Sequence, residues 1–167
     1  MTTAESNDPI HSLSKVPLFS TLHKIPDALK ALASIMKIQK FSAGSTLLTE
    51  DELGDQFFVL IEGQVSVYKK TPEGDSYKVA ILKSENTPAL GEGGLIEAEP
   101  RTATIQCDSN CTCLVLTRDQ FLIFSEKYPE WSVPILKKIA IQLMGRLKQT
   151  NNDLMLLHKA LMNEIRG

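Results

Sequence analysis

The hydrophobic pattern changes its period twice along the chain. From residue 16 to residue 38, apolar side chains recur every three or four positions, and Pro26 suits the first turn of a helix. From residue 40 to residue 116 the period falls to two, and glycine or proline turns separate short apolar runs. The pattern therefore predicts a helical segment followed by strands near 41–48, 57–61, 64–68, 78–82, 102–106 and 111–116.

Short strands at this spacing are typical of an antiparallel sandwich or barrel. After the last of them, Thr117 is placed to cap a helix. A long helix is then predicted from about Trp131 to Glu164, with Pro134 in the first turn, where proline is tolerated. The sequence thus predicts a mainly β fold with flanking helices. We divide it into a flexible N-terminus (1–15), a β-unit with N-terminal helices (16–130) and a long C-terminal helix (131–167).

Composition narrows the class of protein. The chain has 167 residues, of which 43% are hydrophobic, and this is enough for one core. Its net charge of −2 gives no reason to expect non-specific binding of nucleic acid. There is no apolar run of about 20 residues and no secretory signal pattern at the N-terminus, so we expect a cytoplasmic protein with no membrane partner.

The three cysteines, Cys107, Cys111 and Cys113, crowd together without a C-x-x-C motif, and the three histidines lie far from them in sequence. Buried small side chains on a strand explain this spacing, and a redox or metal role is the alternative. A cupin-like metal enzyme would need histidines on its strands, and the predicted strands have none. We predict no metal site, no cofactor and no catalytic residue.

One polar segment between two predicted strands carries the candidate chemistry. It contains Gly91, Gly93 and Gly94 together with Glu92 and Arg101. Glycines expose backbone N–H groups to an anion, arginine binds phosphate through two parallel hydrogen bonds, and a carboxylate accepts from a ribose hydroxyl. The alternative is a plain surface loop in which the carboxylate and the guanidinium are solvated or paired.

This segment resembles the phosphate-binding cassette of the cyclic-nucleotide-binding domains found in catabolite-activator-type regulators and protein kinase A regulatory subunits. In that family a Gly-Glu pair precedes Arg, a small residue and Ala, as in Gly91-Glu92 and Arg101-Thr102-Ala103 here. The resemblance covers roughly residues 16–165. It includes Phe41-x-x-Gly44-x-x-Leu47 and Asp55-x-Phe57-Phe58-Val59-Leu60-x-x-Gly63-x-Val65-x-Val67.

The resemblance implies an antiparallel double-stranded β-helix, a jelly-roll-like barrel, with N-terminal helices and a long C-terminal helix. It implies a regulatory sensor that binds cAMP, our preferred ligand, or cGMP. Glu92 would accept from the ribose 2′-hydroxyl, and Arg101 would pair with the cyclic phosphate. Backbone N–H groups of residues 91–95, from Gly91 to Leu95, would complete the anion site. Thr102 is compatible with both purines.

The C-terminal helix carries an apolar stripe that extends over about four heptads. The stripe consists of Leu136, Ala140, Leu143, Leu147, Thr150, Leu154, Leu157 and Leu161. We favour a parallel homodimer through this helix over a helix that only covers its own domain. By resemblance, Thr150 and Asn151 are candidate contacts to the base. Equally, Thr150 could bond its own helix carbonyl and Asn151 could be solvated.

Activator-type members of the family continue into a DNA-binding domain after this helix. The chain ends at Gly167, so we expect no DNA binding by this chain alone. It would act as a stand-alone sensor or as the regulatory part of a longer protein. A degenerate domain that uses the fold only for dimerisation is the alternative, and it would require the loop at 84–88 to block the pocket.

Overall fold

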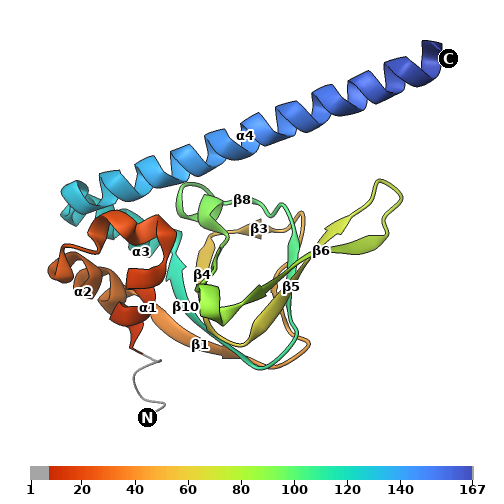
Figure 1. Cartoon of the computed structure of the whole chain (residues 1–167). Helices are drawn as coiled ribbons and strands as arrows, with labels where there is room; N and C mark the ends of the chain where they lie inside the picture. Colours follow the sequence, from red (N-terminus) through yellow and green to blue (C-terminus); the bar gives the residue numbers. More distant parts are fainter. Residues whose placement is uncertain (1–7, 167) are drawn as a thin grey trace.

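The computed structural model describes residues 8–166, which form two facing β-sheets, a helical cap and one long projecting helix (Figure 1). The helices are α1 (Pro9–Lys15), α2 (Pro26–Ile35), α3 (Arg118–Lys127) and α4 (Pro129–Arg166), with 3₁₀ turns η1 (Pro17–Leu22), η2 (Ser84–Asn86) and η3 (Glu92–Leu95). The strands are β1 (Lys37–Phe41), β2 (Thr46–Leu48), β3 (Leu53–Gly54), β4 (Gln56–Glu62), β5 (Gln64–Lys70), β6 (Ser76–Lys83), β7 (Ala89–Leu90), β8 (Glu99–Pro100), β9 (Thr104–Cys107) and β10 (Cys111–Thr117).

The sheets confirm the predicted antiparallel β fold with flanking helices, with one correction. One sheet has the strand order β1-β10-β4-β7 and the other β2-β9-β5-β6, while β3 and β8 form a separate ribbon. Within residues 8–166 the sheets do not close into the expected barrel, because each keeps free edges. The edge strand β6 extends away from the body in a hairpin with β5 and reaches no strand of the other sheet (Figure 1).

The protein has two hydrophobic cores, and strand β4 lies between them. Its four residues from Phe57 to Leu60 are all buried, although neighbouring side chains of a strand point to opposite faces. Phe57 and Val59 pack among the helices, whereas Phe58 and Leu60 pack between the two sheets. A strand covered on both faces reads as a continuous apolar run, which is the pattern that the sequence shows at 57–61.

The N-terminal part is more ordered than we expected. Residues 9–15 lie in the segment predicted to be flexible, yet they form α1. The Asp8 carboxylate accepts from the Ile10 N–H at 3.0 Å, and Leu13 is fully buried in the helical core. Residues 1–7 lie outside the described part of the chain, so their predicted flexibility stays a prediction.

The predicted helix at 16–38 is wrong at its C-terminal end. The segment divides into η1 and α2, with Pro26 at the first position of α2 as predicted, and α2 ends at Ile35. Ile38 belongs to β1, where it pairs with Leu114 of β10. Pairing with a central strand has overridden a helical periodicity that continued through Met36.

The C-terminal helices begin close to where we predicted. Thr117 caps α3 through a capping box with Gln120, as expected. Helix α4 begins at Pro129, two residues before the predicted start, so Pro134 lies inside the helix and not in its first turn. The missing N–H of a proline removes one hydrogen bond from the helix at this point. Ile135 and Ile139 are fully buried in the helical core and fix the start of α4 on the domain.

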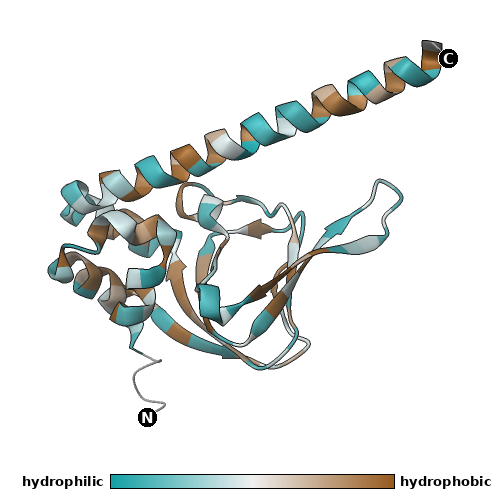
Figure 2. Cartoon of the chain, in the orientation of Figure 1, coloured by the Kyte–Doolittle hydropathy of each residue, from teal (hydrophilic) through white to brown (hydrophobic). Residues whose placement is uncertain are grey.

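Beyond Arg146 the helix projects from the body, and brown apolar positions remain uncovered along its projecting part (Figure 2). The large exposed side chains there include Leu147, Leu154 and Leu157. None of the helices within residues 8–166 has an apolar stretch of the length that a membrane span requires.

The three cysteines are buried in the core between the sheets, as small apolar side chains are. Burial raises the pKa of the Cys107 thiol to about 11 and that of the Cys113 thiol to about 12. Both thiols are therefore neutral near pH 8, and the neutral form is a poor nucleophile.

We expect the native protein to react only slowly with an aromatic disulfide reagent at pH 8. Unfolding in guanidinium should release all three thiols, the full cysteine content of the chain. Absorbance of the released thiolate measures both phases. Rapid labelling of the native protein at any cysteine would contradict the placement of these strands.

Candidate functional site

The glycine-rich segment predicted to carry the chemistry forms the turn η3 between β7 and β8. Gly91 begins the turn with a φ of 77°, a left-handed conformation that favours glycine. The Gly94 N–H donates to the Gly91 carbonyl at 3.0 Å, and the Leu95 side chain is fully buried among the helices. The turn is thus held at one end by its backbone and at the other by the core.

Three glycines surround the side chain of Arg101. Gly91 and Gly94 belong to the same short segment, whereas Gly54 comes from a distant part of the sequence. A Cβ atom on Gly54 would lie 2.6 Å from the Arg101 Cζ, and one on Gly91 or Gly94 would lie 2.8 Å from Nη1. A side chain at any of these positions would displace the guanidinium, so each glycine leaves room that the guanidinium occupies. The β3–β8 ribbon supplies Gly54, and η3 with its cap supplies the other two.

The guanidinium of Arg101 is buried, with 8% of the residue exposed. Its Nη2 donates to the Gln56 carbonyl at 2.6 Å and its Nη1 to the Gly91 carbonyl at 3.3 Å. Its Nε finds no hydrogen-bond partner among the described residues. Arg101 therefore has one donor that no described residue uses.

Burial lowers the pKa of Arg101, and three carboxylates, those of Asp55, Glu99 and Glu92, oppose this shift. Glu99 packs directly against the turn, because a Cβ atom on Gly93 would overlap its carboxylate. The site thus balances one buried cation against several acidic groups. An anion that enters here must compete with them for the positive charge.

Glu92 is the second polar residue of the predicted site, and it is 8% exposed. Its carboxylate forms an ion pair and a hydrogen bond with the Arg146 guanidinium, which α4 contributes. The Arg146 side chain is 64% exposed, so solvent screens its side of the pair. This contact joins the turn η3 to the C-terminal helix across 54 positions in sequence.

These elements enclose a pocket of about 420 Å³. Seven of the ten predicted site residues line it: Gly91, Glu92, Gly93, Gly94, Arg101, Thr102 and Ala103. The facing wall comes from all four strands of the second sheet and from α4, and it is mainly apolar; its apolar residues include Leu48, Val67, Leu82, Ile105 and Leu143. The pocket combines one polar wall that suits an anion with apolar walls that suit a flat ring.

Three predicted residues do not line the pocket. Leu95 belongs to η3, but its side chain faces the helical core. Thr150 and Asn151 are exposed on α4, beyond the point where the helix passes the pocket. The α4 residues that reach the pocket are Leu143 and Arg146, because the straight helix moves away from the sheets after them.

Sequence reasoning missed the pairing partner of Glu92 and the residues of the sheet wall. The spacing of Val67 and Lys69 on β5 places both side chains on one strand face, and both line the pocket. The alternation was visible in the sequence, but which face looks into the pocket was not. The loop at 84–88, which could have blocked entry, contributes no lining residue.

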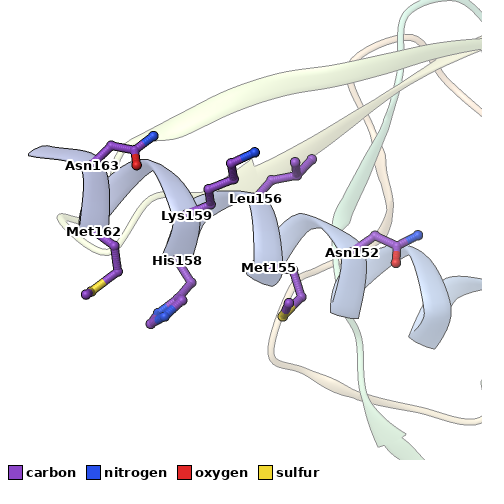
Figure 3. A pocket seen from close by; sticks show the side chains of 7 residues that line it. All are labelled: Asn152, Met155, Leu156, His158, Lys159, Met162 and Asn163. Atoms are coloured by element: carbon purple, nitrogen blue, oxygen red, sulfur yellow. The ribbon is translucent and has the colours of Figure 1, made fainter.

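A second hollow lies along the exposed surface of α4, where Met155, His158 and Met162 point to one side and Leu156 and Lys159 to the other (Figure 3). It has no contact with the turn η3. Within residues 8–166, no cluster of three or more histidine, cysteine, aspartate or glutamate side chains is arranged to hold a metal ion.

Comparison with known families identifies the domain. A sequence model of the cyclic nucleotide-binding domain matches residues 38–128, which include η3, Arg101 and most of both sheets. The chain belongs to the cyclic nucleotide-binding domain family. The sequence resemblance is therefore confirmed, and the pocket beside η3 lies within the matched part of this domain.

Two curated relatives show how this domain is used elsewhere. One is a CRP-like cAMP-activated global transcriptional regulator of Mycobacterium tuberculosis, 27% identical over 129 residues, or 77% of this chain and 55% of the regulator. The other is a cAMP-dependent protein kinase regulatory subunit of Aspergillus niger, 34% identical over 114 residues, or 65% of this chain and 25% of the subunit. The chain thus spans about half the length of the first relative and a quarter of the second.

The structure of the catabolite activator protein of Thermus thermophilus has the same fold, with a TM-score of 0.73 at 22% identity. The similarity covers 84% of this chain and 62% of that protein.

Proposed function

We propose that this domain is a sensor that binds a 3′,5′-cyclic purine nucleotide in the pocket between η3 and α4. The observation that carries the proposal is the position of Arg101 and Glu92 on one wall of a single pocket, beside the glycines of η3. A guanidinium and backbone N–H groups suit the cyclic phosphate, and a carboxylate suits the ribose 2′-hydroxyl. The apolar walls would cover the base.

Arg101 and Glu92 both have partners within the chain, so a bound nucleotide would have to compete with these partners. A ribose hydroxyl that donates to Glu92 would compete with Arg146 for the same carboxylate. Since Arg146 belongs to α4, the nucleotide would act on the position of that helix. We propose this competition as the step by which binding is transmitted to α4.

The role that we propose involves binding and signalling without a chemical step, in the cytoplasm. The names of the two relatives support cAMP as the ligand, as the resemblance also did. Thr102 lines the pocket, and its hydroxyl can donate to one purine or accept from the other, so it does not select the base. Both cAMP and cGMP are therefore tested.

We also propose that α4 forms a parallel homodimer. Its heptad positions Leu147, Leu154 and Leu157 are 62%, 64% and 68% exposed, which is unusual for a run of leucines on one helix. A second copy of the same helix would cover this stripe by packing the leucines against each other. Thr150 lies within this stripe and Asn151 beside it, and both remain candidates for contacts to a nucleotide from the partner helix.

Arg101→Ala should weaken binding of both cAMP and cGMP by at least about 100-fold, because the phosphate loses its charged donor. Isothermal titration measures the loss. Arg101→Lys serves as the matched variant: it keeps the charge but lacks the planar fork, so it should restore only a small part of the affinity. Unchanged affinity in a folded Arg101→Ala protein would contradict the phosphate role. No binding by the unaltered chain would favour a domain used only for dimerisation.

Glu92→Gln should remove discrimination against a ligand without the 2′-hydroxyl. The unaltered domain should bind cAMP about tenfold more tightly than 2′-deoxy-cAMP, as expected for one hydrogen bond to a carboxylate. In the variant this ratio should fall towards one, and parallel titrations measure it. An undiminished ratio would show that another residue contacts the ribose.

Leu154→Lys should convert a dimer into a monomer, because it places a charge in the centre of the apolar stripe. Light scattering after size-exclusion chromatography measures the mass. Asn152→Lys is the control, since it adds the same charge outside the stripe and should leave the dimer intact. A Leu154→Lys protein that still runs as a dimer would locate the interface elsewhere.

A further inference from the structure

The pocket contains one cation that neither the phosphate nor the ribose accounts for. Lys69 lines the pocket from β5, two residues after Val67 on the same strand face. Its neighbour Lys70 points to the other face and pairs with Asp51 at 3.0 Å. Among the ion pairs of the described residues, none involves Lys69, so its ammonium is free to bind a ligand.

We infer that Lys69 reads the base and makes the pocket selective for guanine over adenine. The inference rests on the proposed function, because it assigns a role within the same nucleotide site. It reverses the preference for cAMP that resemblance gave. It depends on where Lys69 lies and on what the edges of the two purines offer to an ammonium group.

The position of Lys69 relative to the ligand follows from which elements form each wall of the pocket. The turn η3 and Arg101 lie on one wall, with the guanidinium directed to the carbonyls of Gln56 and Gly91. Lys69 lies on a different element, the central β5 of the other sheet, and shares the pocket with the apolar Val67 and Leu82. Once phosphate and ribose occupy the first wall, the base is the part of the ligand that faces the second.

The chemistry of the base edge then decides the preference. Lysine is a donor only, with three N–H groups and no acceptor. Guanine presents two adjacent acceptors, O6 and N7, and lysine can bind both. Adenine presents N7 beside a donating N6 amino group, which faces an ammonium unfavourably. One such contact discriminates between bases by about tenfold or more.

The experiment titrates the full chain with three ligands: cGMP, cAMP and cyclic inosine monophosphate. The inosine ligand keeps O6 and N7 but lacks the 2-amino group of guanine, so it isolates the edge that Lys69 would contact. We expect cGMP and the inosine ligand to bind about tenfold more tightly than cAMP. Lys69→Met should weaken both by about tenfold and leave cAMP unchanged. Lys70→Met is the matched control and should preserve all three affinities.

Lys69→Glu provides a second, independent test of the base preference. A carboxylate accepts from the N6 amino group and repels O6, so this variant should bind cAMP more tightly than cGMP. Thermal melting confirms that each variant is folded. Since Lys69 is exposed at the surface of β5, none of these substitutions removes a core contact.

Two results would overturn the inference while leaving the proposed function intact. One is an unaltered domain that binds cAMP at least as tightly as cGMP. The other is an equal loss for all three ligands in Lys69→Met, which would assign the ammonium to the phosphate. If the unaltered domain binds none of the three ligands, the proposed function itself is wrong and the inference falls with it.

Discussion

The site is organised around the burial of one guanidinium. A charged group taken out of water is costly unless its hydrogen bonds are replaced, and Arg101 replaces only part of them, with two backbone carbonyls. Three glycines give it space, and three carboxylates offset its charge. The Arg101 Nε has no hydrogen-bond partner among the described residues, so it could donate to a further acceptor. The cyclic phosphate of the ligand that we propose would be such an acceptor, and it carries the opposite charge.

The small ribbon β3–β8 and the residues beside it hold the backbone of Arg101 in place. The Arg101 N–H donates to the Glu52 carbonyl, and the Asp51 N–H donates to the Arg101 carbonyl, each at 2.9 Å. These bonds place the arginine backbone beside Gly54, and the side chain then turns back towards η3. Without the ribbon, the loop before β9 would have no fixed position from which to deliver the guanidinium.

Sequence alone predicted the local parts of this arrangement. The cassette residues from Gly91 to Ala103 lie close together in sequence, so their grouping on one wall needed no knowledge of the fold. The Thr117 cap and the β-prone run that forms β4 were likewise visible, because each depends on neighbouring residues. The role assigned to Gly91 and Gly94 was incomplete, since they also make room for Arg101.

The parts that could not be predicted all join distant elements. Gly54 touches the guanidinium only because β3 pairs with β8. Arg146 pairs with Glu92 only because this turn of α4 lies beside η3. The burial of Ile135 and Ile139 determines which turn of the helix lies there. Thr150, one turn further on, fails to reach the pocket for the same reason. A helical periodicity gives the face of a residue but not the distance along the helix at which another element meets it.

The pairing of Glu92 with Arg146 also determines how nucleotide binding would be coupled to the position of α4. A nucleotide can shift α4 only by as much as it binds better to one position of the helix than to another. If the ribose and Arg146 compete for Glu92, the nucleotide binds better when α4 has released the carboxylate. Linkage is reciprocal, so a partner that holds α4 in that position raises the affinity for the nucleotide by the same factor. The exposed apolar stripe of α4 is where such a partner would bind, and dimerisation and nucleotide binding would therefore act on the same equilibrium.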